Sequence, residues 1–282
     1  MATRRWKTTA DGNWGTAGNW EEGAAPVNGD DVYFRAGSVS VTAGLDQNTV
    51  ALTSLRVGPG YTGSIGTSSA DMRVDATTFD FAGGGTSYYF AGAYANVIVK
   101  GGTGTNMLHF GKTTAADVDI DSLKIVGPEV RGTVTVNNST VLDAVVMQSC
   151  PSAALTIGSS VTSFDSIDMD NGVVSCASAC AAFNVDGGAL THTTGAVTTI
   201  TMEGNGTIFY NSSGTITTAN VYGGTLSFIN NATSAVIITA GSVYPGGIID
   251  LRSALRNVTT TNGITCYNGI IYPDYGASVT WT

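Results

Sequence analysis

Three similar stretches occur near the end of the chain, Gly223-Gly224-Thr225-Leu226-Ser227-Phe228, Gly246-Gly247-Ile248-Ile249-Asp250-Leu251 and Asn268-Gly269-Ile270-Ile271-Tyr272. The spacing from Leu226 to Ile248 is 22 residues, and the spacing from Ile248 to Ile270 is again 22. A fixed period of about 20 residues, with three short apolar runs in each period, is typical of a β-solenoid. Because one coil cannot cover its own apolar inner face, such coils stack, and the stack forms the core.

Two further apolar series keep nearly the same period, Ile216 to Val236 to Val258 and Val221 to Val243 to Ile264. We therefore expect an all-β chain folded as a right-handed parallel β-helix of roughly ten coils, with three strands per coil. Leu226, Ile248 and Ile270 should point inward in one column. A β-sandwich or jelly roll is the alternative fold that short strands leave open.

Two parts of the chain depart from this period. From Val174 to Leu190 to Ile208 the spacing shortens to 16 and 18 residues, which shorter turns would explain. A run of glycines at 83–85 is followed by several aromatic residues, Tyr88, Tyr89, Phe90 and Tyr94. This second departure predicts a hairpin that protrudes from the repeat.

The composition also favours β-structure. Only 12% of the 282 residues are charged, whereas 37 are glycine, about double the average usage. The polar residues are mainly Thr, Ser and Asn. Thr and the β-branched aliphatic residues favour strands, and Gly and Asn favour tight turns. No window places apolar residues at helical spacing among helix-forming residues.

The net charge of −9, from 12 basic and 21 acidic residues, argues against a nucleic-acid partner, which needs a basic surface. No run of about 20 apolar residues is present to span a membrane, and the first residues lack the apolar segment of a signal peptide. Yet the composition is that of an exported fibre. A virion component made in the host cytoplasm would combine these features, and so would a secreted protein that has lost its signal.

Residues 1–44 differ from the rest of the chain. They hold three of the four tryptophans, Trp6, Trp14 and Trp20, and short alternating strands. The bare end of a solenoid is an open edge, so natural solenoids carry an atypical cap there. We therefore expect residues 1–44 to be an arm with a tryptophan-rich cap that also docks a partner, and residues 45–282 to form the solenoid.

The N-terminal part carries a series of short motifs, namely Gly12-Asn13-Trp14, Gly18-Asn19-Trp20, the Pro-x-x-Gly-Asp-Asp-Val-x-Phe of residues 26–34, and the Ser-Val-x-Val-Thr of residues 38–42. This pattern resembles the start of many bacteriophage virion structural proteins. It is also similar to segments that open the β-solenoid passenger regions of bacterial surface proteins. The stretches that follow, at residues 44–47, 55–58 and 61–66, resemble the phage proteins more closely. The resemblance covers about the first quarter of the chain. It implies a place on a virion and supplies no catalytic residues.

No metal or cofactor is expected. Asp117-Val118-Asp119-Ile120-Asp121 places three carboxylates on one face of a strand, which could suggest Ca²⁺. Alternate residues of one strand are about 6.6 Å apart, however, and a solvated outer face is the simpler interpretation. Four cysteines, Cys150, Cys176, Cys180 and Cys266, lack zinc spacing. We expect buried free thiols, with a Cys176–Cys180 disulfide as the alternative.

No enzymatic activity is expected either. Glycan-cleaving tailspikes are often β-helices and need two carboxylates about 5–9.5 Å apart. Asp75, Asp80 and Asp186 could serve, but the sequence does not bring them together. His109 and His192 are far apart and have no Ser or Cys at motif spacing, so a nucleophilic triad is unsupported. His192 should occupy an outward strand position.

These patterns favour a structural protein on the outer surface of a bacteriophage particle, either a capsid decoration (cement) protein or a head fibre. The alternatives are a tail fibre or tailspike that binds a host glycan, and a fragment of a secreted bacterial adhesin. The expected partner is the major capsid protein or another virion protein, and the expected assembly is a homotrimer.

Two groups of residues should make these contacts. The partner-binding group lies in the arm and cap and comprises Arg4, Arg5, Trp6, Lys7, Trp14 and Trp20. The group at the oligomer interface comprises the C-terminal aromatic residues Tyr267, Tyr272, Tyr275 and Trp281. The basic arm, residues 2–7, should contribute little to folding.

Overall fold

The protein is built almost entirely from short parallel strands. The structure is a computed structural model that describes residues 1–85, 87–102, 107–113, 118–162, 164–231, 235–252 and 258–273. The predicted fold class is confirmed: the chain is all-β and forms a right-handed parallel β-helix of about ten turns. Within the described ranges the one helical element is the 3-10 helix η1 (Ala17–Asn19), and no helix has the length and apolar character needed to cross a membrane.

The chain divides into two compact units, residues 1–146 with 152–156 and residues 147–151 with 157–282. The strands of the first unit are β1 (Thr3–Arg5), β2 (Asp31–Gly37), β3 (Asp46–Tyr61), β4 (Met72–Phe81), β5 (Tyr88–Ala91), β6 (Ala93–Val99), β7 (Leu108–Phe110), β8 (Asp119–Val126) and β9 (Thr133–Ser139). Those of the second unit are β12 (Phe164–Met169), β13 (Val173–Cys176), β14 (Cys180–Val185), β15 (Ala189–His192), β16 (Val197–Met202), β17 (Thr207–Tyr210), β18 (Ile216–Val221), β19 (Gly224–Ser227), β20 (Val236–Val243), β21 (Gly247–Asp250), β22 (Val258–Thr260), β23 (Ile264–Cys266) and β24 (Ile270–Tyr272). The units divide β10 (Val141–Gln148) and β11 (Ala154–Val161) between them.

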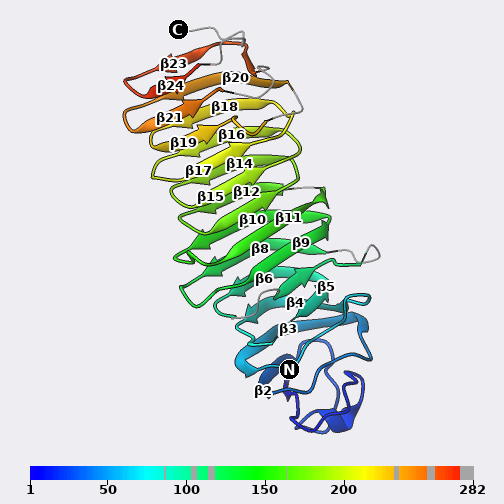
Figure 1. Cartoon of the computed structure of the whole chain (residues 1–282). Helices are drawn as coiled ribbons and strands as arrows, with labels where there is room; N and C mark the ends of the chain where they lie inside the picture. The colour runs from blue at the N-terminus through cyan, green and yellow to red at the C-terminus, as the bar shows by residue number, and fades with distance from the viewer. Residues whose placement is uncertain are drawn as a thin grey trace. The chain divides into compact units, whose positions relative to one another are not determined.

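In the first unit, β2, β3, β4, β6 and β8 pair in parallel, and β5, β7 and β9 form a second row (Figure 1). The predicted hairpin is wrong, because Tyr88 and Phe90 lie on β5 and are fully buried. The glycines allow the backbone to pass between coils, since a Cβ on Gly85 would lie 2.5 Å from the Gly63 carbonyl oxygen. The Gly85 N–H donates to the Tyr88 hydroxyl (2.9 Å), which donates to the Tyr61 carbonyl (3.0 Å).

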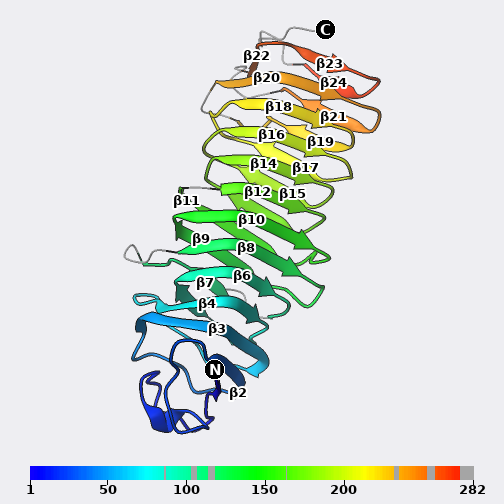
Figure 2. The ribbon, with the colours of Figure 1, turned by 180° about the vertical axis from the view of Figure 1, so that it is seen from behind.

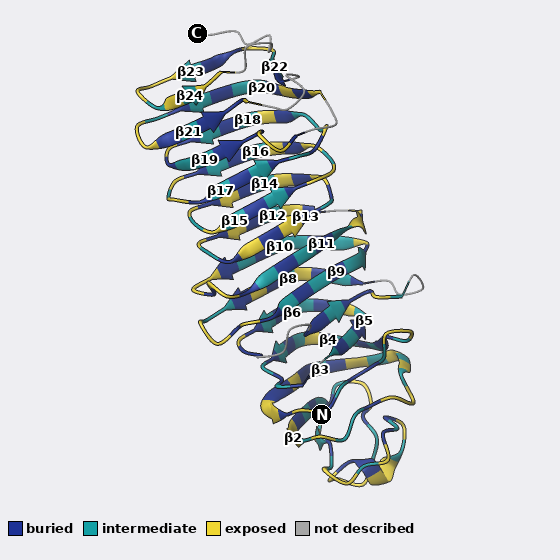
Figure 3. Ribbon diagram, in the orientation of Figure 1, coloured by how far each residue is buried: buried dark blue, intermediate teal, exposed yellow. Residues whose placement is uncertain are grey.

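The second unit repeats one coil design (Figure 2). One row contains β12, β14, β16, β18 and β20, and the other contains β13, β15, β17, β19, β21 and β24. The strands of the first row each turn a corner. The burial pattern shows this, because inward residues are spaced by three and then by two, as in Val197, Ile200 and Met202, instead of by two throughout. The coils from β12 to β21 therefore have two strands each and not the three predicted, since two of the apolar runs share one bent strand (Figure 3).

The predicted inward column is wrong by one residue. Leu226 pairs with Ile249, 23 residues on, and both are fully buried. Ile248 and Ile270 pair with each other but face outward, and Ile270 is 47% exposed. Because side chains alternate along a strand, a slip of one residue exchanges the two faces. The shorter period is confirmed by the pairing of Leu190 with both Val174 and Ile208.

Each of the two other predicted apolar series, from Ile216 and from Val221, contains one pair of residues that do pair in the structure and one pair that do not. Val236 pairs with Val258, and Val221 pairs with Val243. Ile216, however, pairs with Ile238, and Val243 pairs with Cys266. In the last coil, the corner of the bent strand becomes a separate turn between β22 and β23. This turn contains one residue more than the corner of β20, so the spacing between paired residues increases by one across it.

This register predicts opposite outcomes for two adjacent isoleucines. Ile249→Ala should lower the free energy of unfolding by about 2–5 kcal/mol, because it leaves a cavity in the core. Ile248→Ala removes an outward side chain and should cost less than about 1 kcal/mol. Urea denaturation followed by circular dichroism compares them. A larger loss for Ile248→Ala would contradict the register.

The prediction of buried free thiols holds for three of the four cysteines. All four are free, with Cys150, Cys176 and Cys180 buried and Cys266 exposed. Burial raises the pKa of Cys176 to about 11. Cys266 was expected to be buried and is not; it lies on β23, in the last coil that the structure describes.

His192 is also corrected, because it is fully buried and faces inward. Its ring lies between those of Phe183 (5.3 Å between centroids) and Tyr210 (5.0 Å). Its Nε2 lies 2.9 Å from the Gly195 carbonyl oxygen, so a neutral ring with Nε2 protonated fits this site. Burial lowers the pKa of His192, although hydrogen bonding to the Gly195 and Cys176 backbone opposes the shift.

A histidine whose pKa is lowered by folding makes stability depend on pH. Its contribution is complete above the unfolded pKa, about 6.5, and decreases as the pH falls below that value, because protonation then favours the unfolded chain. We expect the thermal midpoint of the wild type to fall more between pH 7 and pH 5 than that of His192→Phe. The Gly195 carbonyl keeps the Ser212 hydroxyl as a donor (2.6 Å) in the variant. Equal pH dependence would contradict the assignment.

Candidate functional site

The basic arm is part of the fold. Thr3, Arg4 and Arg5 form β1, which pairs in parallel with the start of β2. Trp6 follows directly and is 2% exposed. The expectation that residues 2–7 contribute little to folding is therefore wrong, because their removal would take away a strand and a buried indole.

The three N-terminal tryptophans form one buried cluster. Trp20 packs edge to face against Trp6 (5.1 Å between centroids) and against Trp14 (4.9 Å), and Phe34 lies against all three. Trp20 Nε1 donates to the Trp14 carbonyl (2.9 Å), and Trp6 Nε1 donates to the Val39 carbonyl (3.2 Å). Edge-to-face aromatic pairs of this kind add stability beyond the area that they bury. The cluster caps the first coil, and the indoles are not free to contact a partner.

The asparagines of the Gly-Asn-Trp motifs hold the loops that carry these indoles. Asn19 is buried, and its Nδ2 donates to the Asn13 carbonyl (2.7 Å) and to the Asp11 carboxylate. Asn13 Oδ1 accepts the N–H of Gly15 (2.9 Å). A Cβ on Gly44 would lie 2.3 Å from that same oxygen, so glycine is required at this close approach.

Asp30 of the Gly-Asp-Asp motif joins the arm to the cap. It is 2% exposed and accepts hydrogen bonds from the Ala2 N–H and from Arg4 Nε, each at 2.8 Å. Burial raises the pKa of Asp30, but the donors Arg4, Ala2 and Val27 outweigh burial, so the pKa lies below its ordinary value. The contribution of Asp30 to stability is therefore complete above its unfolded pKa and is lost as the pH falls through its lower folded pKa.

Two basic side chains of the arm remain accessible. Arg5 is 43% exposed at its side chain and forms an ion pair with Glu22 (2.8 Å). Lys7 Nζ donates to the Gly18 carbonyl (2.7 Å). Exposed ion pairs contribute about 0–1 kcal/mol, so a partner could displace them at little cost. Of the six residues expected to bind a partner, these two can reach one, and their docking role remains a prediction.

The capping role predicts a large loss of stability from one tryptophan substitution. Trp20→Ala should lower the free energy of unfolding by about 3–5 kcal/mol, because it empties the centre of the aromatic cluster. Lys7→Ala, its control in the same segment, removes one surface hydrogen bond and should change stability by less than about 0.5 kcal/mol. Thermal and urea unfolding measure both. Wild-type stability for Trp20→Ala would exclude the capping role.

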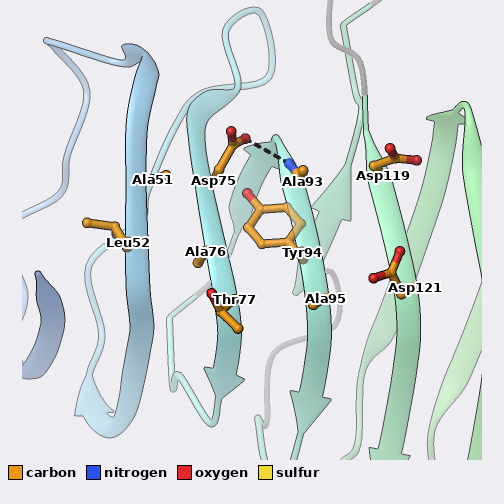
Figure 4. A pocket seen from close by; sticks show the side chains of 10 residues that line it. All are labelled: Ala51, Leu52, Asp75, Ala76, Thr77, Ala93, Tyr94, Ala95, Asp119 and Asp121. Carbon is orange, nitrogen blue, oxygen red and sulfur yellow. Dashed lines mark hydrogen bonds between the residues drawn. The ribbon is translucent and has the colours of Figure 1, made fainter. Parts of the chain in front are cut away.

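A hollow of about 260 Å³ lies on the outer face of β3, β4, β6 and β8 in the first unit (Figure 4). Its lining residues are Ala51, Leu52, Asp75, Ala76, Thr77, Ala93, Tyr94, Ala95, Asp119 and Asp121. The Asp75 carboxylate accepts the Ala93 N–H (2.8 Å), the dashed line in the figure. Among these lining residues the polar side chains are carboxylates and one each of Thr and Tyr, with no histidine, cysteine or cation. The hollow therefore singles out no reaction.

The carboxylates considered in the sequence are distributed as follows. Asp119 and Asp121 lie on β8, with Ile120 buried between them, and Asp117 falls outside the described residues. Asp75 and Asp80 lie on β4, where Asp80 forms an ion pair with Lys100 (3.2 Å). Within the described ranges no group of three His, Cys, Asp or Glu side chains is placed to hold a metal ion.

The C-terminal aromatic residues are partly described. Tyr267 is 51% exposed, and Tyr272 is 40% exposed with the Arg252 guanidinium 4.5 Å from its ring centroid. Tyr275 and Trp281, the other two residues predicted at an oligomer interface, lie outside the described residues. The interface itself remains a prediction.

Sequence reasoning missed that Tyr267 belongs to a stack. Its ring stacks on Tyr244 (5.0 Å between centroids), and Tyr244 stacks on Tyr222 (4.3 Å). Tyr222 and Tyr244 each directly follow the last inward residue of a bent strand, and Tyr267 follows Cys266, which pairs with Val243. The 22-residue step from Val221 to Val243, extended by one residue, would have found the pair Tyr222 and Tyr244.

Comparisons of the chain with family models, with curated proteins and with solved structures found no match.

Proposed function

We propose that this protein is a structural component of the outer surface of a bacteriophage particle, either a capsid decoration protein or a head fibre. The observation that carries the proposal is the structural use of the N-terminal motifs. These motifs resemble the start of phage virion proteins, and in this chain they build the cap on which the first coil of a β-solenoid rests. A solenoid presents repeated outward faces on a firm core, which suits a protein whose task is to bind and to be displayed.

The protein would act by binding a repeated site on the major capsid protein or another virion protein. Arg5 and Lys7, which flank the buried Trp6, are the accessible charges of the arm and would steer the contact. Many copies on one shell strengthen attachment through multivalency, particularly if the protein is a homotrimer. Binding to the assembled shell also stabilises it by mass action.

Two charge reversals test the proposal while preserving the cap. Arg5→Glu and Lys7→Glu change surface side chains, so the combined variant should still fold. Arg5→Glu also places a second carboxylate beside Glu22, which should lower stability by about 1 kcal/mol or less. We expect the combined variant to coat particles at no more than about a tenth of wild-type occupancy in moderate salt. Arg35→Glu, a matched control at an exposed position on β2, should retain occupancy.

Occupancy is measured by quantitative mass spectrometry of purified particles of the phage that encodes the chain. Hundreds of copies per particle support a decoration protein, and a handful would place the protein in the tail instead. Absence of the protein from particles would refute the proposal. Wild-type occupancy of the double reversal would show that the arm is not the anchor.

A further inference from the structure

An exposed stack of aromatic rings runs along one edge of the second unit. We call it the tyrosine strip, and it consists of Tyr222, Tyr244 and Tyr267. Adjacent rings are nearly parallel, with interplanar angles of 15° and 13°. Tyr222 is 42% exposed and Tyr267 is 51% exposed. Exposed aromatic residues gathered in this way mark interaction surfaces rather than ordinary solvated faces.

The backbone fixes the position of the strip. The residues before the three tyrosines, Val221, Val243 and Cys266, pair with one another in register. The N–H of each tyrosine donates to a carbonyl of the preceding coil, Tyr222 to Met202 (2.7 Å), Tyr244 to Val221 (2.9 Å) and Tyr267 to Val243 (2.7 Å). The three side chains therefore leave the coils at equivalent points, about 4.8 Å apart. The strip is a preformed and regular surface.

Three acidic residues occupy the same position in the preceding coils. Asp170 follows Met169, Asp186 follows Val185 and Glu203 follows Met202. The N–H of Asp170 donates to Met147 (3.0 Å) and that of Asp186 donates to Met169 (2.8 Å), as in the tyrosine coils. All three side chains are exposed, and none of the ion pairs within the described ranges involves them. One edge of the unit thus carries carboxylates that lead into stacked rings.

The charge around this edge has one sign. Residues 157–251 of the second unit contain no Lys or Arg, while they contain six acidic residues, Asp165, Asp168, Asp170, Asp186, Glu203 and Asp250. Asp250 pairs with Arg252, which follows directly after this range (2.7 Å). This range therefore offers no cationic side chain to pair with the carboxylates of Asp170, Asp186 and Glu203. A partner that carries positive charge would complement them.

We propose that the tyrosine strip, with the carboxylates that continue it, is a docking surface for an extended arginine-bearing segment of a partner protein. Arginine fits both halves of this edge. Its planar guanidinium pairs with a carboxylate through two parallel hydrogen bonds and also stacks on an aromatic face. Tyr222 is the first ring of the stack, so Tyr244 covers only one of its faces, and Glu203 is the preceding residue of the same column.

The docking surface lies on the second unit and does not depend on the arm or on the proposed place on a virion. The groups that shift the pKa of Tyr222 are its two neighbours along this edge, Tyr244 and Glu203. This pKa is raised by the hydrogen bond and charge of Tyr244, then by desolvation, and finally by the charge of Glu203, which lies within electrostatic reach.

The test uses the purified full-length protein and two fluorescent peptides, hexa-arginine and hexa-lysine, with binding followed by anisotropy. A chain of charge −9 attracts both peptides without specificity. We therefore compare Glu203→Gln with Asp165→Asn, which removes the same charge from an exposed position outside the column. We also compare Tyr222→Ala with Ile237→Ala, another exposed apolar position of the same unit. Circular dichroism confirms that each variant is folded.

We expect the wild type to prefer hexa-arginine to hexa-lysine, and Glu203→Gln to weaken hexa-arginine binding by about fivefold or more. Tyr222→Ala should reduce the preference for arginine, because the stacking face is lost. Both control variants should stay within about twofold of the wild type. Equal losses in Glu203→Gln and Asp165→Asn, or no preference for arginine, would overturn the proposal. It would also be overturned if sedimentation showed self-association that Tyr222→Ala abolishes, since the strip would then contact a second copy of the chain.

Discussion

The whole architecture depends on the stacking of parallel coils in register. Each coil buries its inner side chains only against the coils before and after it, and the same backbone hydrogen bonds that join two coils fix which side chains meet. Leu226 lies under Ile249 because Gly224 pairs with Gly247, and the alternation of the strand then decides that Ile248 faces outward. A column of this kind tolerates changes in turn length, as the spacings of 16, 18 and 23 residues show, provided that the inward face is kept.

The same constraint explains the N-terminal segment. The inner face of the first coil needs a cover, and Trp6, Trp14 and Trp20 supply it around Phe34. Buried polar groups hold this cover in place, chiefly Asn19 and Asp30. The Gly-Asn-Trp and Gly-Asp-Asp motifs therefore have a structural role in this chain, and Arg5 and Lys7 are the accessible charges of the arm beside them.

Much of the fold could be predicted from the sequence, because repeated Gly-Gly turns and short apolar runs report a period directly. The exact inward columns could not be predicted. The sequence motif aligns Leu226 with Ile248, whereas the residue that pairs with Leu226 is Ile249, so the inward and outward faces of the strand are exchanged. His192 was assigned outward for a related reason: a histidine among threonines suggests solvent, and only the register places it between Phe183 and Tyr210. Of the candidate site, the aromatic cap was predictable from its composition. The pairing of the arm and the stacking of Tyr222 on Tyr244 were not, because both depend on contacts between coils.

The central claim is that residues 1–44 are part of the stack and form its cap. Hydrogen exchange of the backbone amides tests this claim most directly. The account predicts slow exchange at Trp6, Trp20 and Asp31, whose N–H groups donate to the Tyr33, Ala17 and Ala2 carbonyls. Their protection should approach that of amides on β4 in the same unit, because they open only with the coil that they cover. Complete exchange of residues 1–44 within seconds, while β4 stays protected, would show that the segment is a separate mobile arm and would contradict the account.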